Sequence, residues 1–246
     1  MDIKNNVEID VQKLSPMMQH YVKTKEEYKD CILFYRLGDF YEMFFQDAIT
    51  VSRELELTLT GKDCGLDERA PMCGVPFHAA ETYVNRLIEK GYKVAICEQV
   101  EDPKQAKGMV RREVTRVVTP GTNLNTQDLE EGKNNYLMSI VYMEDNYGIS
   151  VSDVTTGDCF VTEVDKSRKL LDEINKFTPA EIICNDAFLV SGIPVDDLKN
   201  RLHISLSPLE SWYFDDAVCH NTLLEHFKVS SLDGLGLGDY DSGVIA

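Results

Sequence analysis

Residues 31–45, CILFYRLGDFYEMFF, combine a short apolar run, a Gly-Asp turn and a second aromatic run. The run from Ile32 to Tyr35 predicts a buried strand, and Gly38-Asp39 predicts a turn. Phe40 and Glu42 follow that turn at once, two residues apart. We interpret them as a probe pair, with the ring available for stacking and the carboxylate for a hydrogen bond.

The segments around this stretch predict an α/β first domain with a mixed sheet. Apolar spacing and cap signals predict helices at 17–28, 42–55 and 79–90. Strands are expected near 57–61, at 92–99 and at 114–118. Residues 71–78, bracketed by two prolines, are expected to be irregular.

The second half predicts a different order of elements. Three strands joined by tight turns are expected at 136–143, 147–154 and 158–164. A helix at 166–177, strands at 180–184 and 203–206, and a helix at 215–228 are expected to follow. This order is that of an RNase H-like fold, which alone implies no function. We therefore expect domains at 1–126 and 134–246, joined by a linker at 127–133, and a natural chain that continues beyond 246.

The charge of the chain is unevenly distributed. The formal net charge of the 246 residues is -17. Residues 1–126 hold 17 Lys and Arg against 20 Asp and Glu, whereas residues 127–246 hold 8 against 22. Free DNA would be repelled by the acidic second half, but much less by the nearly neutral first half. The only dense basic set lies there, and it is either a solvated face or a phosphate clamp: Lys104, Lys107, Arg111, Arg112 and Arg116.

Composition also indicates the compartment. The chain contains no run of about 18 apolar residues, the length needed to span a membrane. The polar N-terminal residues do not form a signal peptide. An odd number of cysteines, 7, favours a reducing cytoplasm. Cys64, Cys73 and His78 are the only close group of possible metal ligands, and they lack a fourth ligand for zinc.

The probe pair has two interpretations. Phe40 could be a core residue and Glu42 a solvated residue at a helix N-terminus. Alternatively, the ring could wedge between base steps from the minor groove, where a weakened base pair costs less to unstack. The phosphates would then repel the Glu42 carboxylate on any duplex. A hydrogen bond from a displaced base would offset this repulsion only at a mismatch.

A nuclease or resolvase with an N-terminal DNA-binding domain is the alternative function. Asp153 and Asp158 flank a turn in the second half and could begin a two-metal site. They are more typical of turn and cap residues, and no further carboxylates can be placed beside them. The chain contains no phosphate-binding Gly-x-x-x-x-Gly-Lys-[Ser/Thr] motif. A module that only binds other proteins is a third, weaker option.

Four separated segments resemble one known family. They are 33–44 (LFYRLGDFYEMF), 71–79 (PMCGVPFHA), 94–99 (VAICEQ) and 116–122 (RVVTPGT). Together they are similar to the bacterial MutS family of DNA mismatch-recognition proteins, over roughly residues 14–245. The resemblance implies a mismatch-binding domain followed by a connector domain that is RNase H-like but carries no nuclease chemistry.

The resemblance also implies roles for residues and partners. Phe40 would stack on the mispaired base and Glu42 would accept a hydrogen bond from it, with Met72 and the basic set also at the DNA. This fragment would be no enzyme and hold no cofactor. The full-length family member adds a weak ATPase that binds ATP and Mg, and it forms a homodimer. A MutL-like partner could bind the connector domain. The fragment alone is expected to be a monomer and to bind mismatched double-stranded DNA poorly, because its first domain is not net basic.

Overall fold

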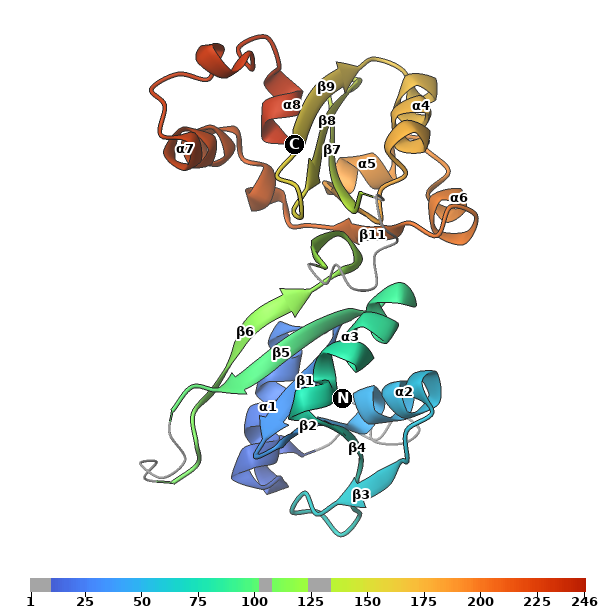
Figure 1. Ribbon diagram of the computed structural model, residues 1–246, viewed down its shortest axis with the longest axis vertical. Helices are drawn as coiled ribbons and strands as arrows, with labels where there is room; N and C mark the ends of the chain where they lie inside the picture. Colours follow the sequence, from blue (N-terminus) through green and yellow to red (C-terminus); the bar gives the residue numbers. More distant parts are fainter. Residues whose placement is uncertain (1–9, 102–107, 124–133) are drawn as a thin grey trace. The chain divides into compact units, whose positions relative to one another are not determined.

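The computed structural model describes residues 10–101, 108–123 and 134–246, and the chain divides into two compact units between Thr119 and Pro120 (Figure 1). The expected boundary at 126 and the expected linker at 127–133 lie outside the described residues. Each unit has its own mixed sheet, of six strands in the first and five in the second. The α/β fold class predicted for both halves is confirmed.

The first unit has the strand order β3-β4-β2-β1-β5-β6, in which only β1 and β5 run parallel. Its strands are β1 (Cys31–Leu37), β2 (Phe40–Phe44), β3 (Thr60–Lys62), β4 (Ala70–Pro76), β5 (Lys93–Gln99) and β6 (Arg112–Val118). Its helices are α1 (Pro16–Glu27), α2 (Phe45–Leu55) and α3 (Ala80–Glu89), with short 3-10 turns η1 (Val11–Lys13) and η2 (Phe77–Ala79).

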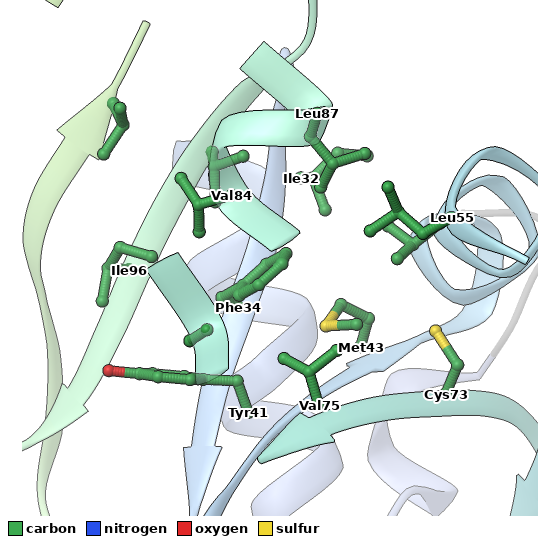
Figure 2. Close-up of a cluster of buried hydrophobic side chains, with 14 of the residues drawn as sticks. Ile32, Phe34, Tyr41, Met43, Leu55, Cys73, Val75, Val84, Leu87 and Ile96 are labelled. Carbon is green, nitrogen blue, oxygen red and sulfur yellow. The ribbon is translucent and has the colours of Figure 1, made fainter. Parts of the chain in front are cut away.

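Alternation along β1 divides the core of the first unit between the two faces of the sheet. Ile32 and Phe34 pack with residues of α2 and α3, and Figure 2 shows them with Leu55 and Leu87. Leu33, on the same strand, points to the other face and packs with residues of α1. Successive strand residues point to opposite faces, and each large apolar side chain buried in this way contributes about 1.5–3 kcal/mol. The predicted buried strand is therefore a central strand covered on both sides.

A buried ion pair joins α1 to α2. Lys25 Nζ lies 3.0 Å from Asp47 Oδ1, and both side chains are largely buried. Asp47 Oδ2 accepts hydrogen bonds from the amide of Leu33 (2.9 Å) and from the hydroxyl of Tyr21 (3.3 Å). The Tyr21 oxygen in turn accepts the amide of Phe44 at 3.2 Å. The network fixes the end of β2 against the two helices.

The prediction of a helix from residue 42 is wrong at its start. Residues 40–44 form strand β2, and α2 begins only at Phe45, whose φ of 54° is left-handed. Strand pairing on both sides of β2 satisfies its backbone groups, and its aromatic residues suit a strand. The helical spacing of Phe44, Ala48 and Val51 predicted the existence of α2 correctly, but the predicted helix began three residues too early.

The expectation of irregular structure at 71–78 is also wrong. Residues 70–76 form β4, which pairs with both β2 and β3. Pro71 and Pro76 are the second and last residues of this strand, near its ends, where a missing N–H is tolerated best. The remaining predicted helices and strands of this unit are confirmed to within about three residues at each end.

The second unit has the strand order β11-β10-β7-β8-β9. β7, β8 and β9 are antiparallel neighbours, and β10 and β11 run parallel to β7. Its strands are β7 (Tyr136–Met143), β8 (Asn146–Asp153), β9 (Cys159–Val164), β10 (Glu181–Cys184) and β11 (Ser205–Pro208). Its helices are α4 (Ser167–Phe177), α5 (Asp186–Leu189), α6 (Val195–Asn200), α7 (Asp216–Phe227) and α8 (Asp241–Ile245); its 3-10 turns are η3 (Pro120–Thr122), η4 (Ser211–Phe214) and η5 (Asp233–Leu235). The RNase H-like order expected from the sequence is confirmed.

One face of the second sheet is covered by residues of α4, α5 and α6, including Leu170, Phe188 and Leu198. On the other face, α8 lies directly on β8. A Cβ added at Gly148 would stand 2.0 Å from the carbonyl oxygen of Ser242. Glycine is therefore required at position 148 for the helix to approach the strand so closely.

Candidate nucleic-acid interface

The probe pair lies on a hairpin formed by β1 and β2. Gly38, in the connecting turn, has a left-handed φ of 57°, which glycine adopts without strain. The first strand pair beyond the turn joins Leu37 to Phe40. The Phe40 ring is 47% exposed, which confirms the prediction of an accessible ring. A large aromatic side chain left exposed at a rigid hairpin is available for stacking.

Alternation along β2 places the probe pair on the face opposite to Tyr41 and Met43. Tyr41 and Met43 point into the core formed with α2 and α3, as Figure 2 shows. Phe44 points to the opposite face and packs with residues of α1. Phe40 and Glu42 share that opposite face with Phe44, because residues two apart on a strand point the same way. We call this the probe face.

Glu42 is held between β1 and β4, where its cross-strand neighbours are Tyr35 and Gly74. A Cβ at Gly74 would lie 3.2 Å from the carbonyl oxygen of Tyr41 and 3.4 Å from Cγ of Glu42, so the two strands approach closely at this position. Glu42 Oε2 lies 2.5 Å from Nζ of Lys62, and the Glu42 side chain is only 16% exposed. The carboxylate is therefore paired and partly covered, and is not a solvated helix-terminal residue.

Met72 lies on β4, two residues before Gly74, the cross-strand partner of Glu42. Its strand partners are Phe44 on β2 and Thr60 on β3, and its side chain packs partly buried with the cluster on the probe face. The Thr60 hydroxyl donates a hydrogen bond of 3.1 Å to the Met72 carbonyl oxygen. The structure thus brings Met72 to the same face as Phe40 and Glu42.

The predicted basic set does not form one surface among the described residues. Arg111 is exposed, and its Nε donates a 2.8 Å hydrogen bond to Glu113. Arg116 also pairs with a carboxylate, that of Glu81, at 2.9 Å. Lys104 and Lys107 lie outside the described residues. The exposed guanidinium groups are thus partly neutralised by neighbouring acids.

Arg112 is buried, with 7% exposure, and its placement differs from that expected of a surface phosphate contact. Its Nε donates to the carbonyl oxygen of Arg36 at 2.8 Å, and its Nη1 donates to that of Val110 at 2.7 Å. Its guanidinium lies 5.3 Å from the centre of the Tyr35 ring. These contacts tie β6 to β1 and support the strand that carries the hairpin.

Two further side chains of the probe face were missed by the sequence analysis. Lys62 follows the strand expected near 57–61, and its pairing with Glu42 depends on β4, in a stretch for which the sequence predicts irregular structure. His20 of α1 lies 2.9 Å from the Tyr35 hydroxyl. Burial, together with the nearby Arg112 charge, lowers the pKa of His20, and burial raises the pKa of Tyr35 to about 12. Both rings are therefore neutral near pH 7.

The two aspartates considered for a nuclease site make turn contacts. Asp153 is buried, and its Oδ1 accepts the amide and the hydroxyl of Thr155 at 2.8 and 2.6 Å. Its Oδ2 accepts the amide of Asn135 at 3.2 Å. Burial acts to raise the pKa of Asp153, but these hydrogen bonds outweigh it and the pKa is lowered. Asp158 is exposed and accepts a hydrogen bond from Thr156.

The candidate zinc ligands are separated. Cys64 packs in the cluster on the probe face, whereas Cys73 packs in the core between the sheet and α2 and α3. Within residues 10–101, 108–123 and 134–246, His, Cys, Asp and Glu side chains form no group of three or more that could hold a metal ion. None of the helices described is both long and apolar enough to cross a bilayer.

Comparison with known proteins gives one consistent result. The family model of MutS domain I matches residues 15–127, and that of MutS domain II matches residues 135–245. The chain is 66% identical over 234 residues to the DNA mismatch repair protein MutS of Lachnoclostridium phytofermentans, covering 95% of this chain and 25% of that protein.

Two further relatives carry the same name. The identity is 59% over 223 residues with that of Clostridium beijerinckii (90% of this chain, 24% of the relative), and 55% over 218 residues with that of Acetivibrio thermocellus (87% and 25%). The chain therefore spans about a quarter of the length of these curated relatives.

Proposed function

Because the chain belongs to the MutS family, of which it carries domains I and II, we propose that it supplies the mismatch-sensing part of a DNA mismatch repair protein. One observation carries the proposal: Phe40 is 47% exposed at a fixed hairpin, with Glu42 on the same face of the same strand. The first residue supplies a stacking surface and the second a hydrogen-bond acceptor.

Phe40 enters the minor groove in the proposed mechanism and stacks on a mispaired base. The hairpin is held by strand pairing on both sides of β2, so little conformational entropy is lost when the ring is inserted. Unstacking a base step costs a few kcal/mol and least where the pair is already weak. Discrimination thus arises from deformability without a sequence-specific contact.

Glu42 then accepts a hydrogen bond from the displaced base. A carboxylate close to phosphates disfavours any duplex, and a base donor offsets that cost only where the base is displaced. Met72 lies on the same face and could contact the sugar or base edge beside the wedge. Arg111 and Arg116 are exposed and could exchange their carboxylate partners for phosphates.

Other properties of the family are proposals for the full-length protein. We propose that it binds ATP with Mg, forms a homodimer and contacts a MutL-like partner through the connector domain. The nearly neutral first half leads us to expect that the 246-residue chain alone binds DNA weakly. The expected salt dependence of that binding is correspondingly shallow.

The experiment that tests the proposal is Phe40→Ala in the full-length protein. Affinity is measured for a duplex with one mismatch and for the same duplex correctly paired, at one salt concentration. Stacking on an aromatic side chain is worth about 1–3 kcal/mol per base, so the preference for the mismatch should fall about tenfold or more. Affinity for the paired duplex should change little.

Phe77→Ala is the matched control. Phe77 is 49% exposed, close to the value for Phe40, but its ring packs against Tyr41 on the other face of the sheet. The preference should survive this substitution. An unchanged preference in Phe40→Ala would refute the proposed role, and an equal loss in both variants would show that recognition does not depend on the probe face.

A further inference from the structure

The ion pair between Lys62 and Glu42 points to a determinant of specificity beyond the probe pair. We propose that Lys62 sets the degree of mismatch discrimination by neutralising the Glu42 carboxylate while the protein approaches DNA. The inference rests on the proposed function and concerns the same site. Lys62 is then a positioning and counter-charge residue, whereas Phe40 and Glu42 contact the base.

The backbone positions of Lys62 and Glu42 are far apart along the sheet. Lys62 on β3 is opposite Ala70 of β4, whereas Glu42 on β2 is opposite Gly74. Four residues of a strand span roughly 13 Å, so the two side chains meet only because they lean toward each other. The Lys62 ammonium lies 5.6 Å from the centre of the Phe44 ring, whose negative face stabilises the cation on this path.

Lys62 is the residue that pairs with the Glu42 carboxylate. Among the described residues it is the single ion-pair and hydrogen-bond partner of the Glu42 carboxylate, and it binds Oε2. Oε1 has no hydrogen-bond donor in the described part of the chain, so it is left for a base. The Lys62 side chain is 33% exposed and that of Glu42 16%, and this partial cover makes the pair stronger than a fully solvated one.

The ion pair with Lys62 reduces the repulsion between the Glu42 carboxylate and the phosphates, and we expect this to matter more on a correctly paired duplex than at a mismatch. On a correctly paired duplex no base donor reaches Glu42, so Lys62 is its only compensation against the phosphates. At a mismatch the displaced base supplies a second compensation. Removing Lys62 should therefore weaken binding to paired DNA more than binding to mismatched DNA, and discrimination should rise. Lys62 in this mechanism favours affinity at the expense of selectivity.

A double-mutant cycle in the full-length protein tests the inference. The proteins are wild type, Lys62→Met, Glu42→Gln and the double variant, each measured on mismatched and on paired duplex of one sequence. Methionine keeps much of the length of the stem and removes the charge. For a partly covered pair worth somewhat under 1 kcal/mol, Lys62→Met should raise the ratio of the two affinities about fivefold. In the Glu42→Gln background the same change should leave the ratio unaltered.

Two control variants distinguish the effect of the Lys62 charge from the effect of losing any surface lysine. Lys90→Met removes a lysine that also pairs with a glutamate, Glu54, at 3.1 Å but lies at the end of α3, among the elements on the other face of the sheet. It should leave the ratio at the wild-type value. Lys62→Arg keeps the charge and should do the same, which also shows that a change at position 62 is tolerated by the fold.

The outcomes are distinct. If Lys62→Met weakens binding to both duplexes by one factor, in both backgrounds, then Lys62 is a plain phosphate contact and the inference is overturned. If the ratio rises equally with and without the Glu42 carboxylate, the effect does not pass through Glu42 and the inference is again overturned. A wild-type protein without any preference for the mismatch would instead contradict the proposed function itself.

Discussion

Replacing Asp47 by alanine should destabilise the first unit selectively. The substitution leaves the ammonium of Lys25 without its carboxylate, with one remaining hydrogen bond to the carbonyl of Cys31. It also removes the acceptor of the Leu33 amide. Breaking a buried ion pair by deleting one partner costs about 3–5 kcal/mol. Because the total stability of a domain is about 5–15 kcal/mol, a loss near 4 kcal/mol would leave the first unit marginally stable.

The chain offers a convenient assay for this loss. Its single tryptophan, Trp212, belongs to the second unit, so tryptophan fluorescence follows that unit while circular dichroism follows both. In a urea titration of Asp47→Ala, we expect part of the circular dichroism change to move to lower urea. The fluorescence midpoint should stay at the wild-type value and serve as an internal control.

A double variant sharpens the test. Lys25→Met with Asp47→Leu removes both charges and replaces them with apolar side chains of similar length, and such replacements are often neutral or stabilising. It should recover the part of the stability lost by Asp47→Ala that comes from the uncompensated charge, although the Leu33 amide still lacks its acceptor. A cost below about 1 kcal/mol for Asp47→Ala, or a double variant as unstable as the single one, would refute the reasoning that the cost comes from an uncompensated buried charge.

Asp153 and Gly148 allow further tests of the second unit. Lowering pH below 3.8, the usual pKa of aspartate, should destabilise the second unit, because the pKa of Asp153 is lowered in the folded state; Asp153→Asn should reduce this pH dependence in tryptophan fluorescence. Gly148→Ala should loosen α8 and destabilise the second unit by about 1–3 kcal/mol, seen as faster hydrogen exchange at 241–245, whereas Gly234→Ala, with open space around it, should not.

The elements with a clear apolar period could be predicted from the sequence. α3, β5 and the three antiparallel strands of the second unit carry such a period, and the structure has them within a few residues. α5, α6 and α8 were missed because helices of 4 to 6 residues present too little of a period to recognise.

Tertiary pairing decided the elements that the sequence analysis assigned wrongly. Residues 42–44 directly precede the residues of α2 and share their helical spacing. The backbone of β4 supplies hydrogen-bond partners that hold residues 42–44 in a strand instead. Arg112 belongs to a basic run whose composition indicates a surface, yet its donors meet the carbonyl oxygens of Arg36 and Val110. The Lys62 contact depends on the register of β3 with β4 and of β4 with β2, and no local pattern encodes that register.

The alternation of β2 has a consequence for how this recognition element could be transferred or changed. Within Phe40 to Phe44, Tyr41 and Met43 serve the core on one face, whereas Phe40 and Glu42 serve recognition on the other face, where Phe44 is buried against α1. Inserting or deleting one residue in β2 would exchange the two sets, since a shift of one position turns every side chain to the opposite face. A graft of Phe40 and Glu42 onto another scaffold must therefore take Tyr41 and Met43 with them, into an apolar layer able to receive both.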